Sequence, residues 1–215
     1  MNLNPLFIGL ACAVALFWAI GAYGRLMRLR GKVKKSFAAL DAVMLRELTW
    51  MQARLPPELR GENRPAPAAT LGDESRAALT RLWSACEQLA AVLAQARQDP
   101  CQPPALESLA AAHDTLGAAW QRAIDHLAAA PEAAAAPDLP DAPEAAPGAD
   151  SARAGSAQLA AHRMHLLHQS LPLREAFNAA VLAYNRAIAQ FPASLLARAC
   201  RLRAAGTLRA LSLPL

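Results

Sequence analysis

A proline-free stretch in the first quarter of the chain constrains the fold more than any other feature. From Pro5 to the next proline at Pro56 nothing in the sequence interrupts a helix, and residues 5–23 carry no charged side chain. About 19 residues that rise about 1.5 Å each span roughly 28 Å, close to the hydrocarbon thickness of a bilayer. We therefore predict a membrane-spanning helix over 5–23 that continues without a break into the rest of the protein, ending near Leu55.

The second part of this stretch is amphipathic rather than uniformly apolar. Its large apolar side chains recur at steps of three and four residues, the period of one face of an α-helix. These positions are Leu26, Leu29, Val33, Phe37, Leu40, Met44, Leu48, Met51 and Leu55. We predict that the later helices pack on this apolar stripe.

The middle of the chain predicts two helices bounded by prolines. The first follows a proline-rich loop at 56–72 and begins at Asp73 or Ser75, whose side chains accept hydrogen bonds from free helix amides. The second covers roughly 105–129 and follows the helix breaker DPCQPP. His113 lies beside the apolar face of the second helix, where a single histidine is expected to pack rather than to bind a ligand.

The last part of the chain combines a low-complexity stretch with a final helical region. Residues 130–156 consist mainly of alanine, proline and acidic residues, and we predict a disordered linker because they bury too little apolar surface to offset the entropy of ordering. Residues 157–215 are predicted to be helical, with an interruption or kink at Pro172 and a break at Pro192. The chain, 54% hydrophobic and rich in alanine, is therefore predicted to be all-α, with 24–129 and 157–215 forming an antiparallel helical bundle.

Three aromatic residues of the final region recur seven residues apart: Phe177, Tyr184 and Phe191. We name them the aromatic line and predict that they pack along one face of their helix. Asn178 and Asn185 each follow one of these rings, about 100° further round the helix, where a side-chain amide can bond to a neighbouring helix and fix its register.

The placement of charge predicts how the chain is oriented in a membrane. The net charge is +5, and a block of basic residues follows the apolar stretch directly: Arg25, Arg28, Arg30, Lys32, Lys34 and Lys35. Cytoplasmic flanks of membrane helices carry such an excess, so residues 1–4 are predicted to lie outside and 24–215 in the cytoplasm. The block is also expected to enrich anionic lipid at the inner face. Nucleic acid is not predicted as a partner, because no aromatic side chains alternate with these basic residues.

No pattern in the sequence predicts an enzyme or a cofactor. It lacks a phosphate-binding glycine loop, a GxSxG and an HExxH motif. The four cysteines (Cys12, Cys86, Cys101 and Cys200) have no CxxC spacing, and we expect reduced thiols. His162, His165 and His168 lie three residues apart, but the third is rotated about 120° from the first on a helix, so no metal site is predicted.

Both ends of the chain resemble the LemA family of proteins. In that family a Tyr-Asn-x-Leu-Val-x-Leu-Arg run follows the membrane segment, an aromatic residue and an Asp come later, and paired Tyr-Asn steps close on Phe-Pro. The corresponding residues here are Tyr23, Leu29, Arg30, Asp41, Arg174, Asn178, Tyr184, Asn185, Phe191 and Pro192. The middle of the chain is similar only in being helical, and 130–156 corresponds to an insertion.

The resemblance implies a membrane-anchored four-helix bundle that faces the cytoplasm from the inner membrane of a bacterium and has no enzyme activity. We expect a scaffold or a protein of envelope and membrane homeostasis, acting through an unidentified protein partner, with homo-oligomers also open. The alternative is a coiled-coil signalling component that forms a dimer through its first helix.

Overall fold

The computed structural model describes residues 5–55, 73–133 and 147–208. Within these ranges all regular structure is α-helical, which confirms the prediction of an all-α protein. The helices are α1 (Pro5–Arg54), α2 (Asp73–Gln98), α3 (Pro103–Ala133), α4 (Pro147–Ala189) and α5 (Ala193–Ala199). The predicted N-terminal residues 1–4 and the predicted loop at 56–72 lie outside the described residues.

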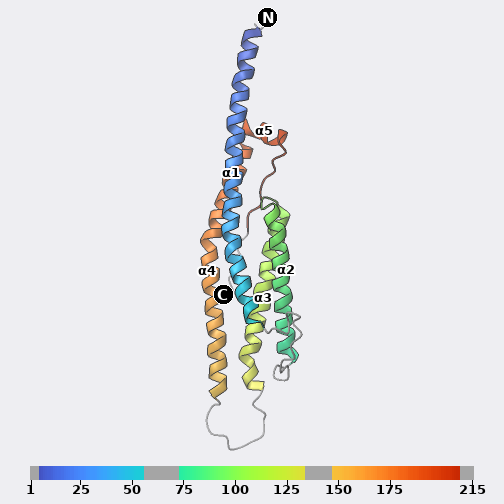
Figure 1. Cartoon of the computed structure of the whole chain (residues 1–215), viewed down its shortest axis with the longest axis vertical. Helices are drawn as coiled ribbons and strands as arrows, with labels where there is room; N and C mark the ends of the chain where they lie inside the picture. The colour runs from blue at the N-terminus through green and yellow to red at the C-terminus, as the bar shows by residue number, and fades with distance from the viewer. Residues whose placement is uncertain (1–4, 56–72, 134–146, 209–215) are drawn as a thin grey trace, which may run out of the picture.

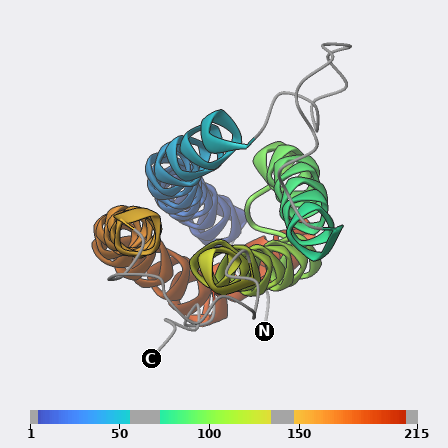
Figure 2. The ribbon, with the colours of Figure 1, turned by 90° about the horizontal axis from the view of Figure 1, so that it is seen from below.

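Helices α1 to α4 lie side by side, and each runs in the opposite direction to the one before it (Figure 1). Viewed along the long axis, they surround a common interior (Figure 2). One continuous set of buried side chains from all four helices fills this interior. We call this part, consisting of α2, α3, α4 and residues 26–54 of α1, the helical body.

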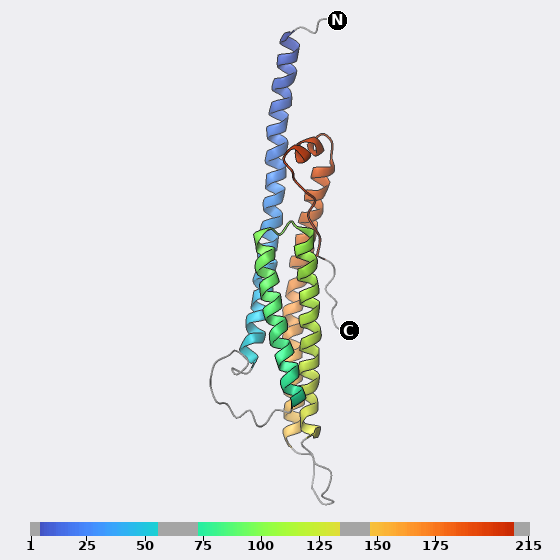
Figure 3. The ribbon, with the colours of Figure 1, turned by 90° about the vertical axis from the view of Figure 1, so that its right-hand side faces the viewer.

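Helix α1 has two parts with opposite surroundings. In its second part the predicted apolar stripe is confirmed: all of its members are buried except Leu29, which is partly buried against the core. Its first part extends beyond the other helices (Figure 3) and exposes large side chains such as Leu10, Leu16 and Phe17. Among the described residues α1 is the one helix long and apolar enough to cross a membrane.

Helices extend into the stretch that the sequence composition predicted to be a disordered linker. Within 130–156, α3 continues to Ala133 and α4 begins at Pro147, while residues 134–146 lie outside the described part of the chain. Alanine has the highest helix propensity, and proline is well tolerated in the first turn, where its missing N–H is not needed. These local preferences extend both helices into the alanine-rich stretch.

Pro172 does not end α4, although the sequence predicted an interruption or kink there. The helix runs through it from Pro147 to Ala189. A proline inside a helix removes one backbone hydrogen bond. Leu167 before it and Phe177 after it are both buried, so packing holds both halves of the helix against the helical body.

The C-terminal segment corrects the prediction that the chain is helical again after the break at Pro192. Only α5 is helical there, and residues 202–208 run without regular structure back along α4 (Figure 3). The Asn185 amide donates to the carbonyl of Ala205 and accepts from its N–H, both at 2.8 Å. Asn178 makes the same pair of bonds with Leu208, both at 2.9 Å. The two asparagines therefore bind an irregular segment instead of a neighbouring helix.

The spacing of the two asparagines explains why they bind this segment. Seven helical residues rise about 10.5 Å, and three extended residues cover about 10 Å. Asn178 and Asn185 thus match Leu208 and Ala205 in opposite chain directions. Gly206, between the two held residues, lies against the start of α3, where an added Cβ would lie 2.8 Å from the Cα of Pro103. Only glycine allows this close approach.

Replacing Asn185 by alanine should release the C-terminal segment. The N–H and C=O of Ala205 would lose their partners, which costs about 1–3 kcal/mol for each buried group. Amide hydrogen exchange at Ala205 is expected to accelerate by about tenfold or more. Gln190→Ala, which removes an exposed side chain just after the end of α4, should leave the exchange rate unchanged. Equal exchange in the wild type and Asn185→Ala would show that the asparagine does not hold the segment.

Candidate functional site

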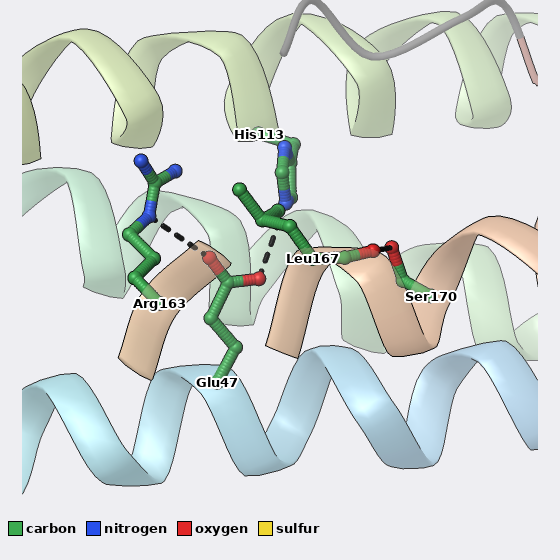
Figure 4. A network of polar contacts seen from close by, with 5 residues as sticks. All are labelled: Glu47, His113, Arg163, Leu167 and Ser170. Carbon is green, nitrogen blue, oxygen red and sulfur yellow. Dashed lines mark hydrogen bonds and ion pairs between the residues drawn. The ribbon is translucent and has the colours of Figure 1, made fainter. Parts of the chain in front are cut away.

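Three charged or ionisable side chains meet inside the helical body (Figure 4). Glu47 of α1 lies between His113 of α3 and Arg163 of α4, and each of the three is 4% exposed. His113 Nε2 donates to Glu47 Oε2 at 3.2 Å, and Arg163 Nε donates to Glu47 Oε1 at 3.3 Å. Both carboxylate oxygens are thus bonded, each to a different helix.

The three polar residues occupy positions on the buried apolar faces of their helices. Glu47 lies three residues after the buried Met44, His113 lies four after Leu109, and Arg163 lies four before Leu167. Positions three or four apart share one face of a helix. The sequence prediction noted His113 beside its stripe but missed Glu47 and Arg163. The signal that identifies them is complementary charge at the core positions of three different helices.

The electrostatics of the cluster keep Glu47 ionised. Burial alone would raise the pKa of its carboxyl group, but the hydrogen bond and charge of His113, together with Arg163, outweigh burial and lower this pKa. For Arg163, burial lowers the pKa of the guanidinium, and the charge of Glu47 opposes that change. The carboxylate therefore holds the charged network together.

The surroundings of the cluster favour a structural role. The Ser170 hydroxyl donates to the carbonyl of Leu167 in its own helix, not to Glu47 (Figure 4). Burial and the negative charges of Glu47 and Glu87 raise the pKa of the Cys86 thiol to about 12, so it stays protonated and is a poor nucleophile. A cavity of about 230 Å³ opens beside His113 and Arg163.

Aromatic rings lie next to the cluster. One of the three histidines that the sequence spaces three residues apart packs against them. The ring of Trp50 lies 5.4 Å from that of Trp120 and stacks on His162 at 4.6 Å, centroid to centroid. His165 lies 2.8 Å from the Gln169 amide, one turn further along α4. His162 and His165 thus have separate neighbours, and the described residues contain no group of three metal-ligating side chains.

Arg30 differs from the other residues of the basic block because it belongs to a second polar site. Its guanidinium lies 3.6 Å from Asp99 in the turn between α2 and α3. Its Nε is buried with no hydrogen-bond partner in the described part of the chain. A cavity of about 380 Å³ adjoins it, bordered also by Tyr184, Arg201 and Arg203. Burial raises the pKa of Tyr184, which therefore stays neutral here.

The other residues of the basic block point outward. Arg25, Arg28, Lys32, Lys34 and Lys35 are exposed. They lie around α1 just beyond its apolar first part, so they are available to contact solvent or lipid headgroups.

The residues that carry the family resemblance have different environments. Asp41 accepts two bonds from Arg97 Nε, at 2.9 and 3.0 Å, which ties α1 to α2. Tyr184 is buried, Leu29 and Arg174 are partly buried, and Tyr23 is exposed. The motif residues therefore do not gather into one site, and only some of them, such as Asp41, join one element to another.

Phe191 departs from the predicted aromatic line. Phe177 and Tyr184 are buried against α1, and the Phe177 ring lies 5.9 Å from that of Phe37. Phe191 is 81% exposed instead. Helix α4 ends at Ala189, so the seven-residue period no longer sets the direction of a side chain two residues later, and Pro192 follows outside the helix.

Replacing Glu47 by glutamine should destabilise the helical body strongly. Removing one member of a buried ion pair leaves the other charge uncompensated, which costs about 3–5 kcal/mol. Asp41→Asn breaks an ion pair at the surface and should cost only about 0.2–1 kcal/mol. Thermal unfolding of the full-length protein, followed by circular dichroism, measures both variants. A loss in Glu47→Gln no larger than that in Asp41→Asn would contradict the assigned role of the cluster.

Comparing the wild type with Glu47→Gln also tests how the stability of the helical body depends on pH. Because the pKa of Glu47 is lowered in the folded state, its stabilising contribution is complete above the ordinary value of 4.5 and disappears as the pH falls through the lowered pKa. Below pH 4.5 the wild type should therefore lose stability relative to Glu47→Gln. The difference between their unfolding temperatures should narrow.

Comparison with known proteins assigns no family: the chain matches no protein-family model, no curated protein and no solved structure. The resemblance to the LemA family therefore rests only on the motif residues at the two ends of the chain.

Proposed function

We propose that this protein is a non-catalytic, membrane-anchored helical bundle of the LemA type, which presents the helical body as a scaffold for a partner protein. The observation that carries the proposal is the division of α1. One helix exposes large apolar side chains such as Leu10, Leu16 and Phe17 in its first part and buries the apolar stripe of its second part inside the helical body. Exposed apolar surface of this extent marks a contact with a membrane or another protein, and its length suits a bilayer.

The charged residues at the end of the apolar part support an orientation. Arg25, Arg28 and Lys32 are exposed and follow the apolar residues directly. An excess of such residues marks the cytoplasmic flank of a membrane helix. We infer that the helical body faces the cytoplasm from the inner membrane of a bacterium, with the N-terminus outside and anionic lipid enriched around the block.

The packing of α1 favours the scaffold over a signalling dimer. A dimer through this helix would need its apolar stripe, but Val33, Leu40 and Met51 are completely buried within the same chain. The interior cluster favours a structural role as well. Glu47 bonds to His113 and Arg163, and the described residues bring no activated hydroxyl or thiol to it.

Crosslinking in cells, followed by affinity purification of the full-length protein, tests the scaffold. We expect one protein partner in roughly equimolar yield. Leu40→Asp places an unpaired charge in the core, which is costly enough to unfold the helical body and should abolish recovery of the partner. Ala42→Asp changes an exposed residue of the same helix and should retain it.

Two outcomes would contradict the proposal. Recovery of self-crosslinks alone would favour the signalling dimer. Undiminished recovery of the partner with Leu40→Asp would show that α1 recruits it without a folded helical body.

A further inference from the structure

The corner between α4 and α5 presents two large apolar side chains that the described part of the chain leaves uncovered. Phe191 is 81% exposed and Leu195 is 60% exposed. A single exposed apolar residue is ordinary on a soluble surface, but neighbouring ones of this size indicate a contact surface. The question is which partner covers them.

The position of the corner along α1 identifies the partner. A groove of about 330 Å³ lies between Trp18 and Ala22 of α1 on one side and Phe191 and Pro192 on the other. The corner is therefore level with the end of the apolar part of α1. In Figures 1 and 3, α5 lies across the long axis of the molecule beside α1. If α1 crosses a bilayer, α5 lies along the membrane surface.

The composition around the groove matches the boundary between headgroups and acyl chains. Trp18 lines the groove, Tyr23 lies five residues further along α1, and both are exposed. Aromatic side chains concentrate at this depth of a membrane. Arg25 lines the same groove, and Arg198 of α5 is exposed. Apolar residues flanked by arginine are typical of segments that lie in the interface of an anionic bilayer.

We propose that Phe191 and Leu195 insert into the headgroup–acyl boundary of the membrane that α1 enters, so that the α4–α5 corner is a second membrane contact. The inference rests on the proposed membrane anchor. The partner is lipid because the corner continues the exposed apolar surface of α1. Contact at two places, on α1 and on the α4–α5 corner, fixes the tilt of the helical body relative to the bilayer.

Photo-crosslinking to lipid tests this contact in the full-length protein. A benzophenone amino acid replaces one residue at a time, at Phe17, Phe191, Leu195 or Leu45, in vesicles of phosphatidylcholine and phosphatidylglycerol. Phe17 lies in the apolar part of α1 and is 82% exposed, whereas Leu45 is 38% exposed and lies about 33 Å along α1 beyond Tyr23. All four side chains are exposed, so the replacements should preserve the fold, which circular dichroism verifies.

Lipid adducts at Phe191 and Leu195 should approach the yield at Phe17 and exceed that at Leu45 by about tenfold, because only the first three lie at bilayer depth. Adducts at Phe17 alone would overturn the second contact and leave the anchor intact. Absence of lipid adducts at Phe17 would overturn the anchor itself and the second contact with it. Crosslinks from Phe191 to another copy of the chain, or equal yields at Phe191 and Leu45, would also overturn the inference.

Discussion

The continuity of α1 is the constraint on which the rest of the structure depends. Its buried stripe, from Leu26 to Leu55, is shared with the common core, and each large side chain that leaves water there contributes about 1.5–3 kcal/mol. The first part of the same helix carries exposed apolar side chains such as Leu10, Leu16 and Phe17. Because a helix transmits position and rotation along its length, α1 sets both the height and the orientation of the helical body relative to its apolar first part. The α4–α5 corner lies beside that part for the same reason.

The interior polar groups specify how the helices are arranged rather than how tightly they pack. Leucine and alanine side chains allow neighbouring helices to slide by a turn with little loss of burial. Glu47 removes that freedom, since its two oxygens have to meet His113 of α3 and Arg163 of α4 at the same time. A buried charge without partners is strongly unfavourable, so shifted arrangements are excluded. Asn178 and Asn185 act likewise on the C-terminal segment, where each amide binds both polar groups of one residue.

Local signals predicted the helices and their buried faces, whereas contacts between distant segments escaped prediction. The stripe of α1 was correct because a helical period of three and four residues is set by the helix itself. Glu47 and Arg163 were missed because their partners are 66 and 116 residues away in the sequence. The prediction of helix for residues 202–208 was wrong. Local propensity favours helix there, but the hydrogen bonds to Asn178 and Asn185 favour an irregular segment. The seven-residue period placed Phe191 on the aromatic line, but this prediction was wrong because the helix ends before Phe191.

Hydrogen exchange along α1, measured on the full-length protein in lipid vesicles, tests its continuity most directly. The junction is its weakest part, because glycine costs about 1 kcal/mol relative to alanine in a helix and a Cβ added at Gly21, Gly24 or Gly31 would meet no other part of the protein within 4 Å. A single helix predicts slow exchange throughout residues 18–33. A run of rapidly exchanging amides between Gly21 and Gly31 would show a hinge. The apolar part of α1 would then no longer fix the position of the helical body.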